Sequence, residues 1–241
     1  MSENAKMPTS HQLASHHLAS HHLAPHHLAP HHLALHHIGL RWQNKLLLQD
    51  FSLTIAPGEI AVIQGPSGCG KSTLLSAIAG TAPASLTISG DITLDDTTIT
   101  KAPPESRRIA ILFQEALLFP HLTVAQNLAF GLPEGGGRTA RHDAIETALQ
   151  EAGLEGYGNS DPAHLSGGQK ARIAMMRAML SAPKALLMDE SFASLDPELR
   201  AQFGRFVADK VRQQNIPALL ISHHEDDKAF ATGQVISWPK R

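Results

Sequence analysis

The chain has 241 residues, 42% of them hydrophobic, which suits one α/β domain of about 200 residues with an appendage. Its formal net charge of −2 indicates neither a nucleic acid nor a membrane surface as a partner. One cysteine excludes a disulfide framework within the chain, and no apolar run of about eighteen residues is present to span a bilayer.

Residues 11–37 form a histidine-rich repeat with a period of five residues. This period follows neither the face of a helix nor that of a strand, and Pro25 and Pro30 discourage a helix. We therefore expect residues 1–34 to be a disordered tail. Three interpretations stay open: a repeat without a role, a transition-metal site of neutral imidazoles, and a pH response from rings that charge below about pH 6.5.

The folded domain is expected over residues 35–241. Residues 36–42 and 46–55 read as two strands joined by a turn at residues 43–45, and Pro57-Gly58 ends the second. Trp42 closes the first strand. Its ring could stack on a nucleotide base or pack at the edge of the core, and the residues alone do not separate the two.

A phosphate-binding loop follows the short apolar strand predicted at residues 60–63. Small residues let successive backbone N–H groups turn toward phosphate oxygens, and the next helix, predicted to end before Gly80, adds its positive end. In this pattern Lys71 reaches the β- and γ-phosphates, and the Ser72 hydroxyl binds Mg²⁺. The predicted nucleotide-binding residues here are Gly65, Pro66, Ser67, Gly68, Cys69, Gly70, Lys71, Ser72 and Thr73.

The middle of the chain alternates strand and helix patterns. A hairpin is predicted over residues 88–99, and a strand over residues 109–113 ends at Gln114. Helical patterns at residues 124–130 and 140–152 then predict a helical insertion over about residues 115–165.

Two further stretches carry chemistry. The sequence Leu-Ser-Gly-Gly-Gln at residues 165–169 stands directly before a helix, and such a turn at a helix start can bind an anion. The apolar strand predicted at residues 185–189 ends in Asp189, and Glu190 follows directly. Carboxylates at a strand's C-terminal end point to the edge where α/β folds bind ligands. Asp189 is thus placed to assist Mg²⁺, and Glu190 to polarise a water molecule.

In order and spacing these motifs resemble the ATP-binding subunit of an ABC transporter, over about residues 35–238. The resemblance implies an α/β P-loop NTPase core with an antiparallel β-subdomain and a helical insertion. It also implies ATP and Mg²⁺ as cofactors. Residues 103–127 are most similar to ATPases of thiamine-type and related small-solute importers.

The resemblance assigns roles to individual residues. Trp42 would stack on adenine. Ser72 and Gln114 would coordinate Mg²⁺, with Asp189 helping through water. Glu190 would be the general base and His223 the switch histidine at the γ-phosphate, in a catalytic set completed by Lys71 and Gln114. The remaining nucleotide-binding residues implied are Ser166, Gly167, Gly168, Gln169 and Asp196.

Several partners follow from the same resemblance. A second copy of the chain would dimerise head to tail, each copy placing its 166–168 segment on the other's ATP. A separate integral membrane permease is expected, with Phe119, Leu122 and Val124 as candidate contacts or as packing within the insertion. A solute-binding protein could join the complex, and no nucleic acid is expected. The subunit would sit peripherally on the cytoplasmic face of the inner (cell) membrane. The alternative is a soluble ABC-type ATPase that acts on protein or nucleic acid.

The chain departs from the family pattern next to two catalytic positions. Ser191 follows the general base where the family has proline, and His224 follows the switch histidine where the family has aspartate. The pair of histidines leaves the register open, although Ser222 before it favours His223. We expect neither change to abolish hydrolysis, because the acting side chains remain.

Overall fold

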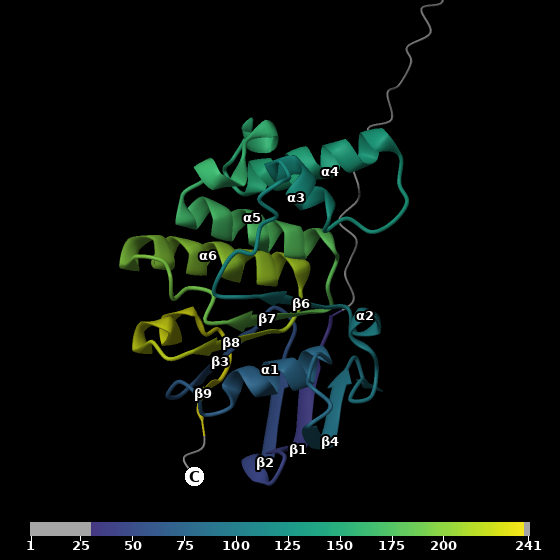
Figure 1. The fold of residues 1–241 in the computed structure, drawn as a ribbon, viewed down its shortest axis with the longest axis vertical. Helices are drawn as coiled ribbons and strands as arrows, with labels where there is room; N and C mark the ends of the chain where they lie inside the picture. The colour runs from purple at the N-terminus through teal and green to yellow at the C-terminus, as the bar shows by residue number, and fades with distance from the viewer. Residues whose placement is uncertain (1–29, 239–241) are drawn as a thin grey trace, which may run out of the picture.

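The computed structural model describes residues 30–238, which build two sheets with helices on both sides of the second one (Figure 1). A four-stranded antiparallel sheet has the order β2-β1-β4-β5, and a five-stranded parallel sheet has the order β6-β7-β8-β3-β9. The α/β architecture with an antiparallel β-subdomain is therefore confirmed. The strands are β1 (Leu33–Trp42), β2 (Lys45–Ile55), β3 (Ile60–Gln64), β4 (Leu86–Leu94), β5 (Thr97–Thr98), β6 (Ile109–Leu112), β7 (Ala185–Asp189), β8 (Ala218–Ser222) and β9 (Val235–Ser237).

The antiparallel sheet has the strands and turns that the sequence predicted. β2 alternates from Phe51 to Ile55 and buries one face, as expected for a sheet with one side in water, whereas β1 begins with three consecutive buried residues. β1 begins at Leu33, two residues before the boundary expected, because Leu33 and Ala34 already pair with β2 and β4. The predicted hairpin is formed by β4 and β5.

The parallel sheet places the functional strand ends at one edge. β3, β7 and β8 are buried along nearly their whole length, as short apolar strands covered on both faces should be. The pairing aligns Gln64 at the end of β3 with Ser222 at the end of β8, and Asp189 of β7 with Ile221. The residues that follow these strands therefore meet at the carboxyl edge.

Helices cover the parallel sheet on both faces. In Figure 1, α1 lies on the side of the antiparallel sheet, and α5 and α6 lie on the other side. Leu74 and Ile78 of α1 join the core shared with the antiparallel sheet, whereas Met175 of α5 and Val207 of α6 join a second core. The helices are α1 (Lys71–Ala79), α2 (Pro104–Arg107), α3 (Val124–Ala129), α4 (Arg138–Glu151), α5 (Gly167–Leu180) and α6 (Pro197–Gln214), with 3-10 turns η1 (Tyr157–Asn159), η2 (Pro162–His164) and η3 (Glu225–Phe230).

The two helices predicted between residues 115 and 165 occur as α3 and α4. They share a third apolar core with one face of α5, built around Val124, Leu128 and Leu149. The Lys210 ammonium of α6 donates to the Glu151 carboxylate at the end of α4 (2.9 Å), which ties this helical layer to the rest of the domain. Of the helices in residues 30–238, none combines the length and the apolar character needed to cross a bilayer.

The last histidines of the repeat belong to the folded domain. The His31 ring hydrogen-bonds the Asp95 carboxylate in the β4–β5 turn (2.7 Å), and the Lys184 ammonium binds the same oxygen (2.8 Å). His36 and His37 lie in β1. Within residues 30–238, no three histidine, cysteine or acidic residues gather as metal ligands would. Residues 1–29, which hold most of the repeat, lie outside the described part, so its metal and pH interpretations stay predictions.

Candidate functional site

Residues 65–70 form the phosphate loop between β3 and α1. Gly68 and Gly70 adopt left-handed backbone angles, with φ of 75° and 108°, which side chains on Cβ disfavour. A left-handed residue beside one of ordinary φ is the backbone pattern of anion-binding nests, and here Gly68 and Gly70 alternate with Ser67 and Cys69. Pro66, Ser67 and Gly68 are exposed, so the loop is open to a ligand. An exposed loop between a buried strand and a helix is what the predicted phosphate-binding role requires.

The Lys71 ammonium lies inside the phosphate loop. The side chain is only 4% exposed, and its Nζ donates to the Gly65 and Pro66 carbonyls at 2.9 and 2.8 Å. Both acceptors are neutral, so phosphate oxygens would compete for this cation through stronger, charge-assisted hydrogen bonds. The next two residues belong to the first turn of α1, where Ser72 is exposed and Thr73 is partly buried.

Ser72 and Asp189 meet where a magnesium ion is expected. The Ser72 hydroxyl donates to Asp189 Oδ1 at 3.0 Å, although the two residues come from α1 and β7. A hydroxyl and a carboxylate are the hard oxygen ligands that Mg²⁺ prefers, so the donor set fits that ion. Gln114 follows β6, which is the neighbour of β7. The backbone carbonyl of Gln114 accepts a hydrogen bond from the Ser194 hydroxyl at 3.4 Å. It therefore lies at the same edge.

Burial raises the pKa of Asp189 above its ordinary value. The nearby Glu190 charge raises the pKa further, while the Ser72 hydrogen bond and the Lys71 charge oppose the shift. The folded chain therefore binds the Asp189 proton more tightly than the unfolded chain does. The ionised carboxylate lowers the free energy of unfolding at neutral pH, and this cost disappears as pH falls through the raised pKa.

We expect Asp189→Asn to raise the melting temperature at about pH 7.5, because the amide keeps the acceptor for Ser72 without a buried charge. The margin over the wild type should shrink as pH falls through the raised pKa of Asp189 and vanish below the ordinary aspartate pKa of about 3.9. Scanning calorimetry across this range without nucleotide or magnesium measures the effect. Asp209→Asn, an exposed change on α6, should show no such trend. An Asp189→Asn variant that is less stable than the wild type at neutral pH would contradict the raised pKa of Asp189.

Glu190 and His223 form a pair at the ends of neighbouring strands. The His223 Nδ1 lies 3.1 Å from Glu190 Oε1, and both side chains are partly open to solvent. Glu190 has a left-handed φ of 51° while its N–H donates to the Ile221 carbonyl of β8 at 3.0 Å. Such conformations of non-glycine residues cost free energy and cluster at functional sites. The contact with Glu190 supports the register that assigns the switch position to His223.

A buried network behind His223 was not predicted from the sequence. The Ser222 hydroxyl donates to Asp227 Oδ2 at 2.5 Å and accepts from the His224 N–H at 2.9 Å. The Gln64 amide nitrogen donates to the His224 carbonyl at 2.7 Å, which joins this turn to the strand before the phosphate loop. Asp227 is 1% exposed. An aspartate in a polar stretch after a strand gives no signal that it will be buried.

The turn at residues 165–169 begins α5 with a capping box. The Ser166 hydroxyl accepts from the Gln169 N–H at 3.3 Å, and the Gln169 side chain accepts from the Ser166 N–H at 2.8 Å. A Cβ on Gly168 would stand 3.3 Å from the end of the Leu199 side chain of α6, so the helix start packs closely against α6. Gly167 leaves the helix start uncovered by a side chain. The turn is thus a rigid helix N-terminus, as the anion-binding interpretation requires.

The remaining predicted residues have the following places. Trp42 is 38% exposed at the end of β1, where a ring can stack on a flat ligand. Asp196 caps α6, because its carboxylate accepts from the Leu199 N–H at 2.9 Å. Ser191 is buried, and its hydroxyl has no hydrogen-bond partner among the described residues.

Comparisons with known proteins agree with this geometry. A family model described as ABC transporter matches residues 48–193. The chain is 44% identical over 188 residues to the uncharacterized ABC transporter ATP-binding protein YnjD of Escherichia coli K12, covering 78% of this chain and 87% of that protein. It is 40% identical over 200 residues to the thiamine import ATP-binding protein ThiQ of Shigella flexneri, covering 82% and 84%. The spermidine/putrescine import ATP-binding protein PotA of Pasteurella multocida is 39% identical over 195 residues, covering 80% of this chain and 52% of that protein.

A solved structure has the same fold. The cbiO1 subunit of Clostridium perfringens, described as part of the ABC transporter complex cbiONQ, superposes with a TM-score of 0.77 at 25% identity. The superposition covers 87% of this chain and 85% of that one.

Proposed function

Because this chain is an ATPase that belongs to the ABC transporter family, we propose that it drives the import of a small solute through a separate membrane permease. Import is favoured because ThiQ and PotA are named as import ATP-binding proteins. The observation that carries the proposal concerns Gln114, which lies at the nucleotide edge of the sheet while its neighbours Phe113 and Glu115 line an exposed apolar groove. A partner docked in that groove would therefore be linked to hydrolysis through this segment.

The reaction is the hydrolysis of the terminal phosphoanhydride bond of ATP. Glu190 accepts a proton from a water molecule while the oxygen of that water attacks the γ-phosphorus. The bond between this phosphorus and the bridging oxygen breaks, which leaves ADP and inorganic phosphate. His223, held against Glu190, faces the γ-phosphate, and Lys71 and the loop amides stabilise its negative charge. Magnesium, when bound, neutralises phosphate charge, and Ser72, Asp189 and Gln114 would hold it.

A second copy of the chain completes each site. In Figure 1, α5 and α1 lie on opposite faces of the parallel sheet, so the start of α5 does not belong to the same layer as the phosphate loop. The turn at residues 165–169 is instead available to the ATP of a partner copy. Since Ser166 is the acceptor in its capping bond, its hydroxyl keeps a hydrogen for a phosphate oxygen. Two ATP molecules would be enclosed between the copies, and hydrolysis would open the dimer.

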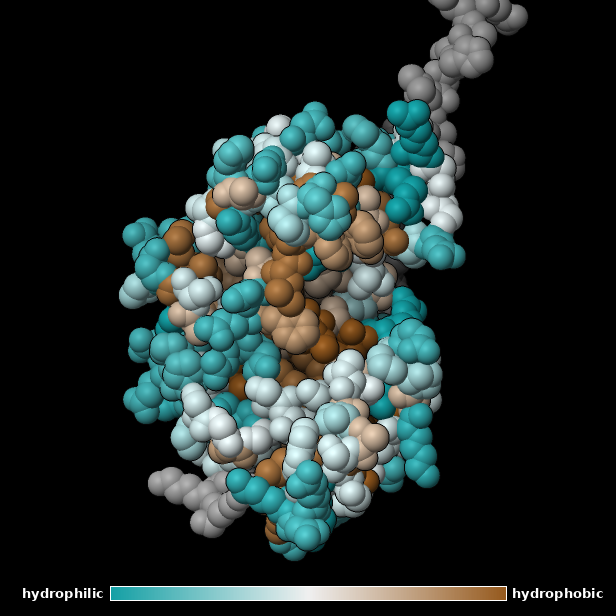
Figure 2. All heavy atoms as spheres, viewed as in Figure 1, coloured by the Kyte–Doolittle hydropathy of each residue, from teal (hydrophilic) through white to brown (hydrophobic). Residues whose placement is uncertain are grey.

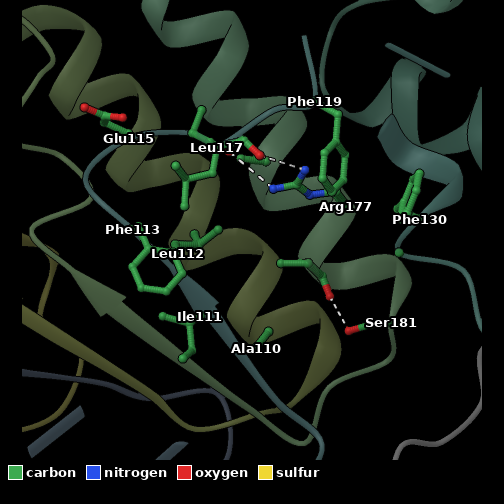
Figure 3. Close-up of a pocket in the computed structure, with 14 residues that line it drawn as sticks. Ala110, Ile111, Leu112, Phe113, Glu115, Leu117, Phe119, Phe130, Arg177 and Ser181 are labelled. Carbon is green, nitrogen blue, oxygen red and sulfur yellow. Dashed lines mark hydrogen bonds between the residues drawn. The ribbon is translucent and has the colours of Figure 1, made fainter. Parts of the chain in front are cut away.

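The apolar groove lies where β6, α3 and α5 meet, and it is visible as the brown hollow in Figure 2. Its volume is about 370 Å³. Figure 3 shows Phe113, Leu117, Phe119 and Phe130 around it, with the Arg177 guanidinium between Leu117 and Phe119. The Arg177 guanidinium donates to the Leu117 and Ala116 carbonyls and lies over the Phe119 ring, which shapes the segment after Gln114. Exposed aromatic side chains in a groove are typical of protein interaction sites.

Of the three candidate permease contacts, Val124 packs inside the helical layer, which is the second of the two alternatives predicted from the sequence. Val124, the first residue of α3, is fully buried and belongs to the same core cluster as Leu128 and Ile173. Leu122 is partly exposed outside the groove lining, and Phe119 lies in the groove. The residues that replace Val124 and Leu122 as candidate contacts are Phe113, Leu117 and Phe130.

The permease is proposed as the occupant of this groove, which would hold the subunit peripherally on the cytoplasmic face of the inner membrane. A solute-binding protein would reach the complex through the permease and not through this chain.

We expect the chain to recover an integral membrane protein in a pull-down from detergent-solubilised membranes, and Phe130→Glu to abolish that recovery. Phe130 is 64% exposed, so the substitution adds a charge to the groove without emptying a core. Tyr157→Glu, an exposed change outside the groove, is the matched control and should leave recovery intact. Recovery of cytosolic proteins or nucleic acid alone would support a soluble ABC-type ATPase instead.

A further inference from the structure

The last described strand of the chain ends beside the phosphate loop. β9 pairs in parallel with β3, and its final pair joins Ser237 to Gln64, the residue directly before the loop. The next residue, Trp238, donates its backbone N–H to the Gln64 carbonyl. This bond continues the ladder by one step and fixes where the Trp238 side chain begins.

The Trp238 side chain lies against the loop at both of its ends. A Cβ on Gly65 would stand 2.6 Å from Trp238 Cβ, and one on Gly70 would stand 3.6 Å from the ring atom Cζ2. The tryptophan is 6% exposed and belongs to the core with Phe51, whose ring centroid lies 6.4 Å away. Its ring therefore spans from the first glycine of the loop to the glycine that precedes α1.

Leu47 also borders Gly70, at 3.6 Å from a Cβ placed there, and the Cys69 sulfur stands 3.6 Å from a Cβ placed on Gly65. Cys69 packs against the same core but is itself part of the loop, and Leu47 lies at one end of it, whereas Trp238 lies against both ends. Four of the loop's six residues are glycine or proline, so side-chain packing can fix little of it from within, and Gly68 and Gly70 can adopt many conformations. The Lys71 bonds to the Gly65 and Pro66 carbonyls are the ones that phosphate would compete for. The contacts with Trp238 lie on the loop's buried side and do not depend on that cation.

We propose that Trp238 is a positioning residue for the phosphate loop. It supports the backbone from beneath, so that the loop N–H groups already point outward when ATP arrives. A loop that is ordered beforehand loses less conformational freedom on binding, and this increases affinity. Trp238 touches neither the water nor Glu190 in this arrangement, so it should affect nucleotide affinity and not the chemical step.

We expect Trp238→Ala to raise the KM for ATP and the Kd for MgADP by about tenfold, with kcat changed by less than about threefold. Trp238→Phe should restore most of the affinity, because a smaller ring still reaches the loop. Ile92→Ala removes a fully buried side chain from the same core on β4, away from the loop. It should lower the melting temperature without raising KM.

Tryptophan fluorescence gives a second readout. The chain has two tryptophans, so Trp42→Phe leaves Trp238 as the only one. Its emission should change when MgATP binds, and also with magnesium pyrophosphate, which lacks the base and ribose. An unchanged KM and Kd in Trp238→Ala would overturn the proposal. Equal increases in KM for Trp238→Ala and Ile92→Ala would also overturn it, since they would reflect general loss of stability.

Discussion

Replacing Glu190 with glutamine should lower the rate of ATP hydrolysis by about 10²–10⁴-fold and leave ATP binding in place. The amide has nearly the shape of the carboxylate and can still hydrogen-bond His223, but it cannot accept the proton of the attacking water. The left-handed backbone at Glu190 and its bond to β8 do not depend on the side-chain charge, so the fold should be unchanged. Phosphate release measured at saturating MgATP tests the rate.

The same variant should form a lasting dimer with ATP, because the enclosed nucleotide is no longer consumed. Size-exclusion chromatography with and without MgATP would detect it. Glu134→Gln makes the same chemical change at an exposed loop position and should hydrolyse ATP normally. A Glu190→Gln variant that hydrolyses ATP at the wild-type rate would show that another group is the base.

Replacing Ser166 with glutamate should lower ATP turnover by about 10²–10³-fold, which is the usual effect of losing a donor to the developing phosphate charge. The acid would also bring a negative charge toward the partner's γ-phosphate. In the Glu190→Gln background it should prevent the ATP-dependent dimer. Thr147→Glu adds the same charge at an exposed position of α4 and should leave both properties intact.

Mixing two defective variants tests whether Ser166 acts on the partner copy. Lys71→Ala damages the phosphate loop, and Ser166→Glu damages the turn that would face the other copy. In a mixed dimer one site combines both defects, and the other combines the intact loop of one chain with the intact turn of the other. In the Glu190→Gln background we expect only the mixture to form an ATP-dependent dimer. If Ser166 acted on the ATP bound to its own chain, the mixture would form no ATP-dependent dimer, like each variant alone.

Much of the site could be predicted because its motifs are local. The strand, phosphate loop and helix over residues 60–79 are consecutive, and the glycines, lysine and serine at their junction have one common use. The apolar runs that form β6, β7 and β8 are short. Gln114 follows closely after β6, Asp189 is the last residue of β7, and His223 comes directly after β8. Parallel packing then brings these ends to one edge, so the candidate set could be named without a structure.

The two alternatives left open at Val124 show the limit of prediction from sequence patterns. An apolar residue near a predicted interface can face the partner or the core, and its neighbours along the chain do not decide between them. In the fold, α4 and α5 pack over the start of α3, which buries Val124 and leaves Phe130, at the other end of that helix, exposed.

The sequence by itself determined the chemistry available to this protein, because the phosphate loop, the carboxylates and the turn before α5 are short motifs whose residues act together locally. Only the tertiary structure decided which distant groups meet. Because β8 lies between β7 and β3, the Glu190 carboxylate meets the His223 ring and Gln64 binds the turn behind it. Because β9 pairs with β3, Trp238 lies beneath Gly65. Such contacts depend on strand order and burial across the whole chain, and no local pattern encodes them.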